Sequence, residues 1–298
     1  MDSQIQVNHL ELLLELFPKK PWDWKYLSEN PNITWEIIQR HLEMPWDWKY
    51  VSCNPNITWD IIQGNPEMPW DRNRIPCNPN IPCDIIQNNI KPRDRRCFSH
   101  NPNITWDIVQ SNPKGKWSWY SLSKNPNITW DIVQSNPEMP WNWYGLSQNI
   151  NITWDIIKNN LNEPWDWYSI SFNPNITWDI VRNNPQIPWD WDGISENPTV
   201  TWDVIQGNQE MPWSFSYIST NPNITWDIVS SNSDKPWDWW ALSENSNITC
   251  DIVRAHPDMP WKWDYLSRNP NITWDIIYDN QDKPLNWIFL SSNTFSKR

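Results

Sequence analysis

The sequence predicts an all-α fold, an α-solenoid of about twelve repeats of 24 residues with two short helices in each repeat. The first observation is a periodic tryptophan: the leading Trp of each unit, or its substitute, recurs every 24 residues from Trp22 to Leu285, with one step of 23. The second is that each unit, such as PWDWKYVSCNPNITWDIIQGNPEM, consists of two similar halves. The third is that each half places a helix-capping residue before a Trp and usually ends in Asn-Pro.

Capping chemistry places the start of each helix. Asp47 and Thr58 are expected to be N-caps, so that Trp48 and Trp59 are the first helical residues of the two halves. The second-half cap is Thr in ten of eleven units, the exception being Pro82. An acidic residue follows the Trp position in all eleven, where its carboxylate interacts favourably with the helix dipole.

The ends and the core follow from the same pattern. Asn54 and Asn65 are expected to close their helices in the left-handed conformation, and the Pro after each prevents continuation. Helices of about seven residues do not persist alone in water. We therefore expect each Trp and the Leu, Ile or Val three positions later to stack into one continuous core.

Along the chain, residues 1–298 are expected to form a single repeat domain. Residues 1–21 are an N-terminal capping half repeat in which Glu11 replaces the Trp. Residues 70–100 are divergent repeats that have lost Trp positions and gained Pro, and residues 285–298 are a truncated C-terminal repeat and tail.

A leucine-rich-repeat-like horseshoe is the structural alternative, because 24 residues is a usual period there and LSxN resembles part of its strand and turn. The motif lacks the strand's alternating leucines, and Pro follows the Asn. These two features favour the helical solenoid.

Charge and composition exclude several classes. The formal net charge is -12, but the acids at the second helical position and the capping Asp residues account for 18 of the 35 acidic side chains. No apolar run approaches the roughly 20 residues of a membrane span. The N-terminus lacks the features of a secretory signal, so we expect an intracellular protein, and its five cysteines are expected to be reduced thiols.

No catalytic, cofactor-binding or metal-ligating residues are expected. His41 and His256 occupy a slot that Asn fills in nine of eleven second halves, so they are interpreted as variant helix ends. A zinc site would have to combine distant residues that lack the close cysteine pair typical of structural zinc, namely Cys77, Cys83, Cys97 and His100.

One basic cluster interrupts the acidic chain within residues 70–100. It is a candidate binding site for an acidic or phosphate-bearing partner, and plain repeat decay is the alternative explanation. Its members are Arg72, Arg74, Lys91, Arg93, Arg95 and Arg96.

Runs such as NPNITWDIVQSNPEMPWNWYGLS resemble the uncharacterised Trp-rich tandem-repeat proteins (NPNITW/PWDW) of mimivirus-like giant DNA viruses of amoebae. The resemblance covers about residues 8 to 293. It implies a viral origin and an intracellular setting, with the host cytoplasm as the expected location, and it brings no catalytic residues with it.

The expected function is a non-enzymatic protein-interaction scaffold with no cofactor, whose variable helix positions, such as Tyr144 with Gly145 or Arg182 with Asn183, face a protein partner. A nucleic-acid-binding repeat protein is the first alternative, disfavoured by the negative charge. A hydrolase with an unrecognised site is the second, disfavoured because no nucleophile and base converge in the pattern.

Overall fold

A computed structural model describes residues 8–86, 96 and 98–295, and every regular element in these residues is helical. The absence of strands from this part of the chain confirms the helical repeat array and rules out the horseshoe, which needs a strand in every repeat. The chain divides into two compact units. Unit 1 combines Met1–Arg74 with Trp237–Arg298, and unit 2 is Ile75–Pro236.

In unit 1, the helices of the first halves are α2 (Trp24–Glu29), α4 (Trp48–Val51), α18 (Trp239–Glu244), α20 (Trp263–Leu266) and α22 (Trp287–Ser292). The other helices of unit 1 are α1 (His9–Leu16), α3 (Trp35–Arg40), α5 (Trp59–Gly64), α19 (Cys250–Ala255) and α21 (Trp274–Asp279).

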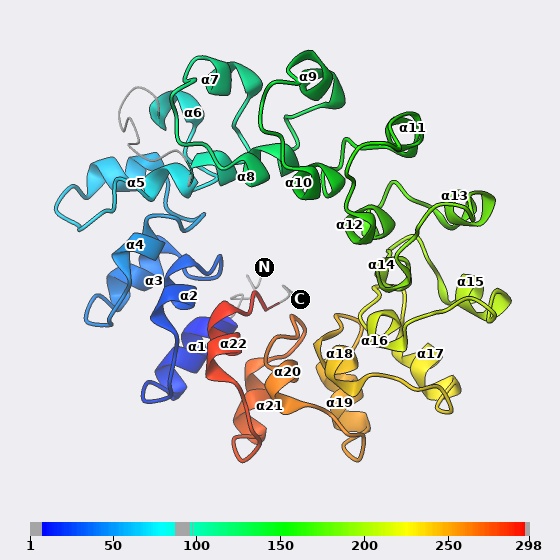
Figure 1. Cartoon of the computed structure of the whole chain (residues 1–298). Coiled ribbons are helices and arrows are strands. Elements are labelled where there is room, and N and C mark those ends of the chain that lie inside the picture. Colours follow the sequence, from blue (N-terminus) through cyan, green and yellow to red (C-terminus); the bar gives the residue numbers. More distant parts are fainter. Residues whose placement is uncertain (1–7, 87–95, 97, 296–298) are drawn as a thin grey trace, which may run out of the picture. The chain divides into compact units, whose positions relative to one another are not determined.

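In unit 2, the elements of the first halves are η1 (Ile75–Cys77), η3 (Phe98–His100), α8 (Trp119–Lys124), α10 (Trp143–Ser147), α12 (Trp167–Phe172), α14 (Trp191–Glu196) and α16 (Phe215–Ile218). Those of the second halves are α6 (Cys83–Ile85), α7 (Trp106–Gln110), α9 (Trp130–Ser135), α11 (Trp154–Asn159), α13 (Trp178–Asn183), α15 (Trp202–Gly207) and α17 (Trp226–Ser231). Figure 1 shows α8 to α16 of the first halves as one layer and α7 to α15 of the second halves as the other.

The capping prediction is confirmed, with a difference between the two halves. Asp47 and Thr58 are N-caps, and helices begin at Trp48 and Trp59. Aspartate and asparagine caps accept at normal distances, such as 3.1 Å from the Lys49 amide to Asp47. Threonine caps are more extended and accept at 3.3 to 3.5 Å or not at all, because their shorter side chain does not reach the first turn as well.

The prediction for the helix-closing asparagines is wrong. Asn30, which occupies the position of Asn54, has φ -66° and ψ 129°, and Asn65 has φ -134° and ψ 60°. Phe295 is the one non-glycine residue with positive φ in the described part of the chain. The side-chain amides of the first-half asparagines instead donate hydrogen bonds to backbone carbonyls of a neighbouring repeat.

Buried Asn and Ser side chains join consecutive repeats. Asn149 is fully buried, and its Nδ2 donates to the carbonyls of Ser123 at 2.8 Å and Asn125 at 3.0 Å in the preceding repeat. The hydroxyl of Ser123 accepts from the Asn142 amide at 2.9 Å. These bonds satisfy polar groups that would otherwise be buried without partners, so they fix the spacing between repeats.

The first and last repeats meet inside unit 1 through the same contacts. The Asp23 amide donates to Ser291 Oγ at 2.9 Å, as successive repeats do elsewhere. Asn30 Nδ2 donates to the carbonyls of Ser291 and Asn293, both at 2.9 Å. The half-repeat helix α1 contacts α21, and Phe17 just after it lies 5.4 Å from the Trp287 ring. α1 therefore packs against the C-terminal repeats as well as preceding the first repeat.

Tryptophans fill the space between repeats. Trp130, Trp143 and Trp165 come from three consecutive repeats, and their rings lie 4.9 to 6.3 Å apart. The indole N–H of Trp165 donates to the Asn160 carbonyl at 2.8 Å, at the end of the preceding helix. These rings are structural, because they pair with each other and satisfy helix ends.

The divergent repeats have reduced helices. A 3₁₀ turn, η1, stands where other repeats have a first-half α-helix, and Pro76 lies within it. The cap of α6 is Pro82, which offers no side-chain acceptor, and α6 is three residues long. None of the helices in the described residues has the length and apolar composition to cross a bilayer.

Candidate functional site

A row of tyrosines runs along the first-half helices of unit 2, and we call it the tyrosine row: Tyr120, Tyr144, Tyr168 and Tyr217. Tyr120 and Tyr144 are 38% and 48% exposed, and their rings stack at 5.8 Å with an interplanar angle of 18°. Tyr168 lies 6.2 Å from Tyr217 in an edge-on arrangement. The rings of Tyr120 and Tyr144 thus present apolar surface that the fold does not cover, whereas Tyr168 and Tyr217 are half-buried.

Helix geometry explains this exposure. In α10, Leu146 follows Trp143 by three positions, so both lie on the face that packs against neighbouring repeats. Tyr144 is one position after Trp143 and is turned about 100° away from that face. The fold therefore determines the Trp and Leu positions but leaves the position directly after the Trp, which Tyr120, Tyr144 and Tyr168 occupy, free for another role.

Two polar side chains beside the tyrosine row, one neutral and one acidic, accept hydrogen bonds from its hydroxyls. The Tyr168 hydroxyl donates to Glu196 Oε2 at 3.0 Å, and the Tyr120 hydroxyl donates to Gln148 Oε1 at 3.3 Å. Burial, with a smaller contribution from the Glu196 charge, raises the pKa of Tyr168 above its usual value. This tyrosine stays a neutral hydrogen-bond donor at physiological pH.

The layer in which the row lies is tightly packed. Gly145 is buried, and a Cβ there would lie 2.6 Å from the Tyr120 carbonyl oxygen. The sequence-based expectation that Gly145 faces a partner is therefore wrong, because a neighbouring helix occupies that side. Tyr144, Arg182 and Asn183 are exposed as expected.

Unit 1 has aromatic side chains at corresponding positions, but basic groups cover several of their rings. Trp240 lies 5.1 Å from Tyr265, and Lys262 Nζ lies 4.6 Å from the Trp240 ring centroid. The Arg268 guanidinium lies 3.7 Å from the Phe289 ring centroid. Cation–π contacts thus use these ring faces within the protein.

The predicted basic cluster is only partly described. Arg72 is exposed and Arg74 is half-buried, with its guanidinium 5.3 Å from the Tyr50 ring centroid, and both belong to unit 1. Arg96 is exposed and belongs to unit 2. The remaining three members lie outside the described residues: Lys91, Arg93 and Arg95.

The cysteines differ from the expectation of five reduced thiols. Cys77 is disulfide-bonded, which removes it from any Cys₃His zinc site, whereas Cys53, Cys83 and Cys250 are free. Burial raises the pKa of both Cys53 and Cys83 to about 11 and also raises that of Cys250. These three thiols are therefore protonated and poorly nucleophilic near neutral pH.

A shallow groove of about 570 Å³ lies between the last two repeats of unit 2. Its apolar lining includes Trp202, Met211 and Phe215, and Asp234 and Lys235 form an ion pair with a 3.5 Å separation at its edge. No Ser, Cys or His is among the lining residues, so the groove suits an apolar side chain better than bond cleavage.

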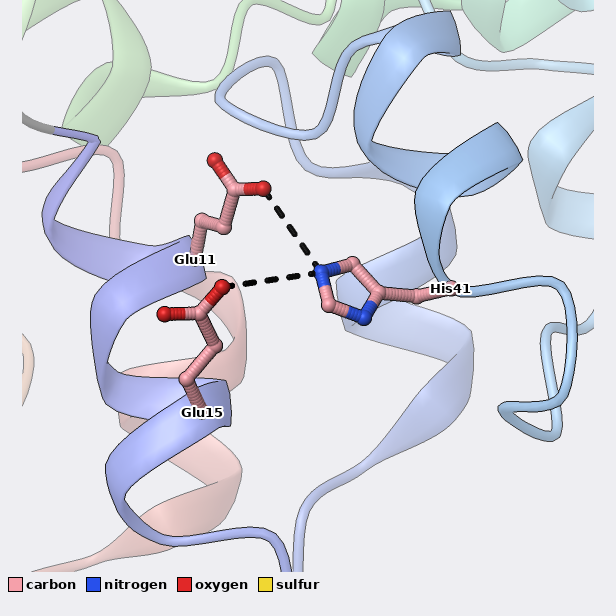
Figure 2. A group of neighbouring side chains, drawn as sticks. All are labelled: Glu11, Glu15 and His41. Atoms are coloured by element: carbon pink, nitrogen blue, oxygen red, sulfur yellow. Dashed lines mark ion pairs between the residues drawn. The ribbon is translucent and has the colours of Figure 1, made fainter.

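A second candidate site is a cluster of ionisable side chains in unit 1, which we call the His41 cluster: Glu11, Glu15 and His41, shown in Figure 2. Glu11 and Glu15 are four positions apart and share one face of α1. His41 is the C-cap of α3, and its Nε2 lies 3.6 Å from Glu11 Oε1 and 3.9 Å from Glu15 Oε1. The three possible ligand atoms lie within 4.8 Å of one another.

In the sequence, Glu11 and His41 are separate features, a polar substitution in the first half repeat and a variant helix end. Nothing in the sequence indicates that they meet, because they lie 30 positions apart and belong to different helices. The sequence holds one indication of this site, because both residues depart from the repeat pattern. Glu11 replaces a Trp in one helix, and His41 replaces an Asn at the end of another.

Comparison of the chain with profiles of known protein families, with characterised proteins and with solved structures finds no match.

Proposed function

We propose that the chain is a non-enzymatic protein-interaction scaffold that binds a protein partner through the tyrosine row. The observation that carries this proposal is the stacked, exposed pair Tyr120 and Tyr144 at a helix position that the fold leaves free. Tyrosines presented on rigid helices supply contact area with little loss of side-chain entropy, and they are enriched where proteins bind proteins.

A protein partner is favoured over nucleic acid by the surroundings of the row. Single-stranded nucleic acid would also stack on aromatic rings, but its binding sites combine those rings with basic groups that follow the phosphates. Glu196 and Gln148 accept hydrogen bonds from the row, and the whole chain carries a net charge of -12. In keeping with the resemblance to giant-virus repeat proteins, we place the interaction in the cytoplasm of an infected amoeba.

The test is quantitative affinity purification from infected host cells with the full chain as bait. The double variant Tyr120→Ser with Tyr144→Ser should lose a partner that the unmodified chain recovers. The matched control is Leu161→Ser, which removes an exposed apolar side chain of the same unit outside the row. Circular dichroism should confirm that all three proteins fold alike.

Retention of every partner by the double variant would refute the tyrosine row as the binding surface. Recovery of nuclease-sensitive material with a strong salt dependence would support the nucleic-acid alternative instead. Charge reversal of the exposed Arg72 to Glu is an independent arm, which tests whether the basic cluster contributes to the same complex.

A further inference from the structure

We propose that the His41 cluster is a binding site for a divalent transition-metal ion, best matched by Zn²⁺, that links α1 to the end of α3. The proposal is independent of the tyrosine row and of any protein partner. It begins with an unsatisfied group: His41 Nε2 is inaccessible to solvent and has no hydrogen-bond partner. Buried polar atoms without partners are rare and call for an explanation.

The ligand set fits zinc. An imidazole nitrogen and two carboxylate oxygens are ligands that Zn²⁺ accepts at about 2.0 to 2.2 Å, which puts tetrahedral ligand atoms about 3.4 Å apart. The observed separations of 3.6 and 3.9 Å from Nε2 to the two carboxylates exceed this slightly. Small side-chain rotations close the difference, and the exposed Glu15 has room to make them. Water would complete the coordination on the open side.

The second ring nitrogen of His41, Nδ1, lies near a carboxylate, as the second nitrogen of a metal-bound histidine usually does. Glu43 Oε1 lies 3.7 Å from His41 Nδ1. A carboxylate near the second ring nitrogen favours the tautomer with the proton on Nδ1, and this leaves the Nε2 lone pair for a metal. With that tautomer and no cation, the lone pair would face two carboxylates.

The local charge matches a divalent ion. The cluster and its neighbours carry three carboxylates, from Glu11, Glu15 and Glu43, and one guanidinium, from Arg40, which gives 3 - 1 = 2 uncompensated negative charges. Protonation of His41 would neutralise one of these charges, whereas a divalent cation would neutralise both. Arg40 Nε donates to Glu11 Oε1 at 3.1 Å, so it competes with the metal for this oxygen.

The metal site would lie on α1, the helix that also contacts the C-terminal repeats of unit 1. α1 contacts α21, and the bound metal would add a link from α1 to α3 within unit 1. A ligand that binds the folded state alone stabilises it by mass action. Zinc would thereby hold α1 in position against the C-terminal repeats.

The experiment is calorimetric titration of ZnCl₂ into the full chain, previously treated with a chelator and with its disulfide intact. We expect one saturable site and a higher melting temperature with zinc. His41→Asn should abolish both effects, and this variant is expected to fold because Asn160, which occupies the same slot, makes the same backbone contact to the following Trp. His256→Asn is the matched control at the same slot of another repeat and should bind zinc normally.

Two further variants separate a metal site from a structural ion-pair cluster. Arg40→Gln should bind zinc more tightly, because it frees the Glu11 oxygen. Glu43→Gln should bind about 10- to 100-fold more weakly, as expected for loss of a carboxylate that orients a ligand histidine. The cobalt(II) form should lack sulfur-to-metal charge-transfer bands, which excludes binding by the free thiols.

Undiminished zinc binding by His41→Asn would overturn the proposal, and so would thiolate bands that survive in that variant. Absence of saturable binding up to roughly 1 mM ZnCl₂ would also overturn it. In that case a destabilisation of His41→Asn that is independent of metal would identify the cluster as ion pairs alone.

Discussion

Replacement of the buried Asn149 by alanine should destabilise unit 2 by about 3 to 6 kcal/mol. Its Nδ2 donates to the carbonyls of Ser123, Asn125 and Ile128 at 2.8 to 3.0 Å, and its Oδ1 accepts from the Asn151 amide at 2.8 Å. Two amide hydrogens serve the three carbonyls, so the side chain makes about three hydrogen bonds. Each leaves a buried or part-buried partner unsatisfied when it is removed, at about 1 to 2 kcal/mol apiece.

Asn160→Ala is the matched control. Asn160 Nδ2 donates to the Ile156 carbonyl of its own helix at 2.7 Å, and the residue is half-buried. Its loss should cost only about 1 kcal/mol, because water replaces the missing partner. Urea unfolding followed by tryptophan fluorescence and circular dichroism gives both free energies, and hydrogen exchange should show α10 opening in the Asn149 variant. Similar costs for the two variants would refute the role of the buried amide in joining repeats.

Two further predictions concern packing and thiol chemistry. Gly145→Ala should lower stability by about 2 kcal/mol because its Cβ would overlap the Tyr120 carbonyl. Gly207→Ala, where a Cβ meets nothing within 4 Å, should be neutral or stabilising by up to about 1 kcal/mol, and thermal melts that fail to separate the two would contradict the close approach of α8 and α10. Because burial raises the pKa of Cys53 to about 11, its alkylation rate, followed by peptide mass analysis, should still increase with pH above 10. A rate that levels off near pH 10, as for the thiol in the urea-unfolded chain, would show that Cys53 is not shielded.

Much of the fold could be predicted because capping is local. The side chain of Asp47 and the amides it caps lie within a few residues, so residue type and spacing determine where α4 begins. The same local reasoning was wrong for the asparagines of the first halves. Local reasoning predicts that each asparagine closes its own helix. The side-chain amide of Asn149 instead donates hydrogen bonds to carbonyls 21 to 26 positions earlier in the chain.

The candidate sites were harder to predict because they depend on how helices stack. The exposure of Tyr144 follows from its position in one helix, and it was predicted. The burial of Gly145 depends on the distance between α8 and α10, and the meeting of Glu11 with His41 depends on which faces of α1 and α3 pack. No periodicity within a single sequence supplies those distances.

The contact between the first and last repeats has a consequence for synthesis on the ribosome. The Asp23 amide gains its acceptor only when Ser291, 268 positions later, has been synthesised, whereas the corresponding Asn142 amide receives its acceptor Ser123 from the preceding repeat. At about 5 to 20 residues per second, this delay is roughly 15 to 50 s. Throughout that time α1 and Phe17 lack the C-terminal surface that covers them, so a nascent chain exposes an apolar face to chaperones that the finished protein conceals.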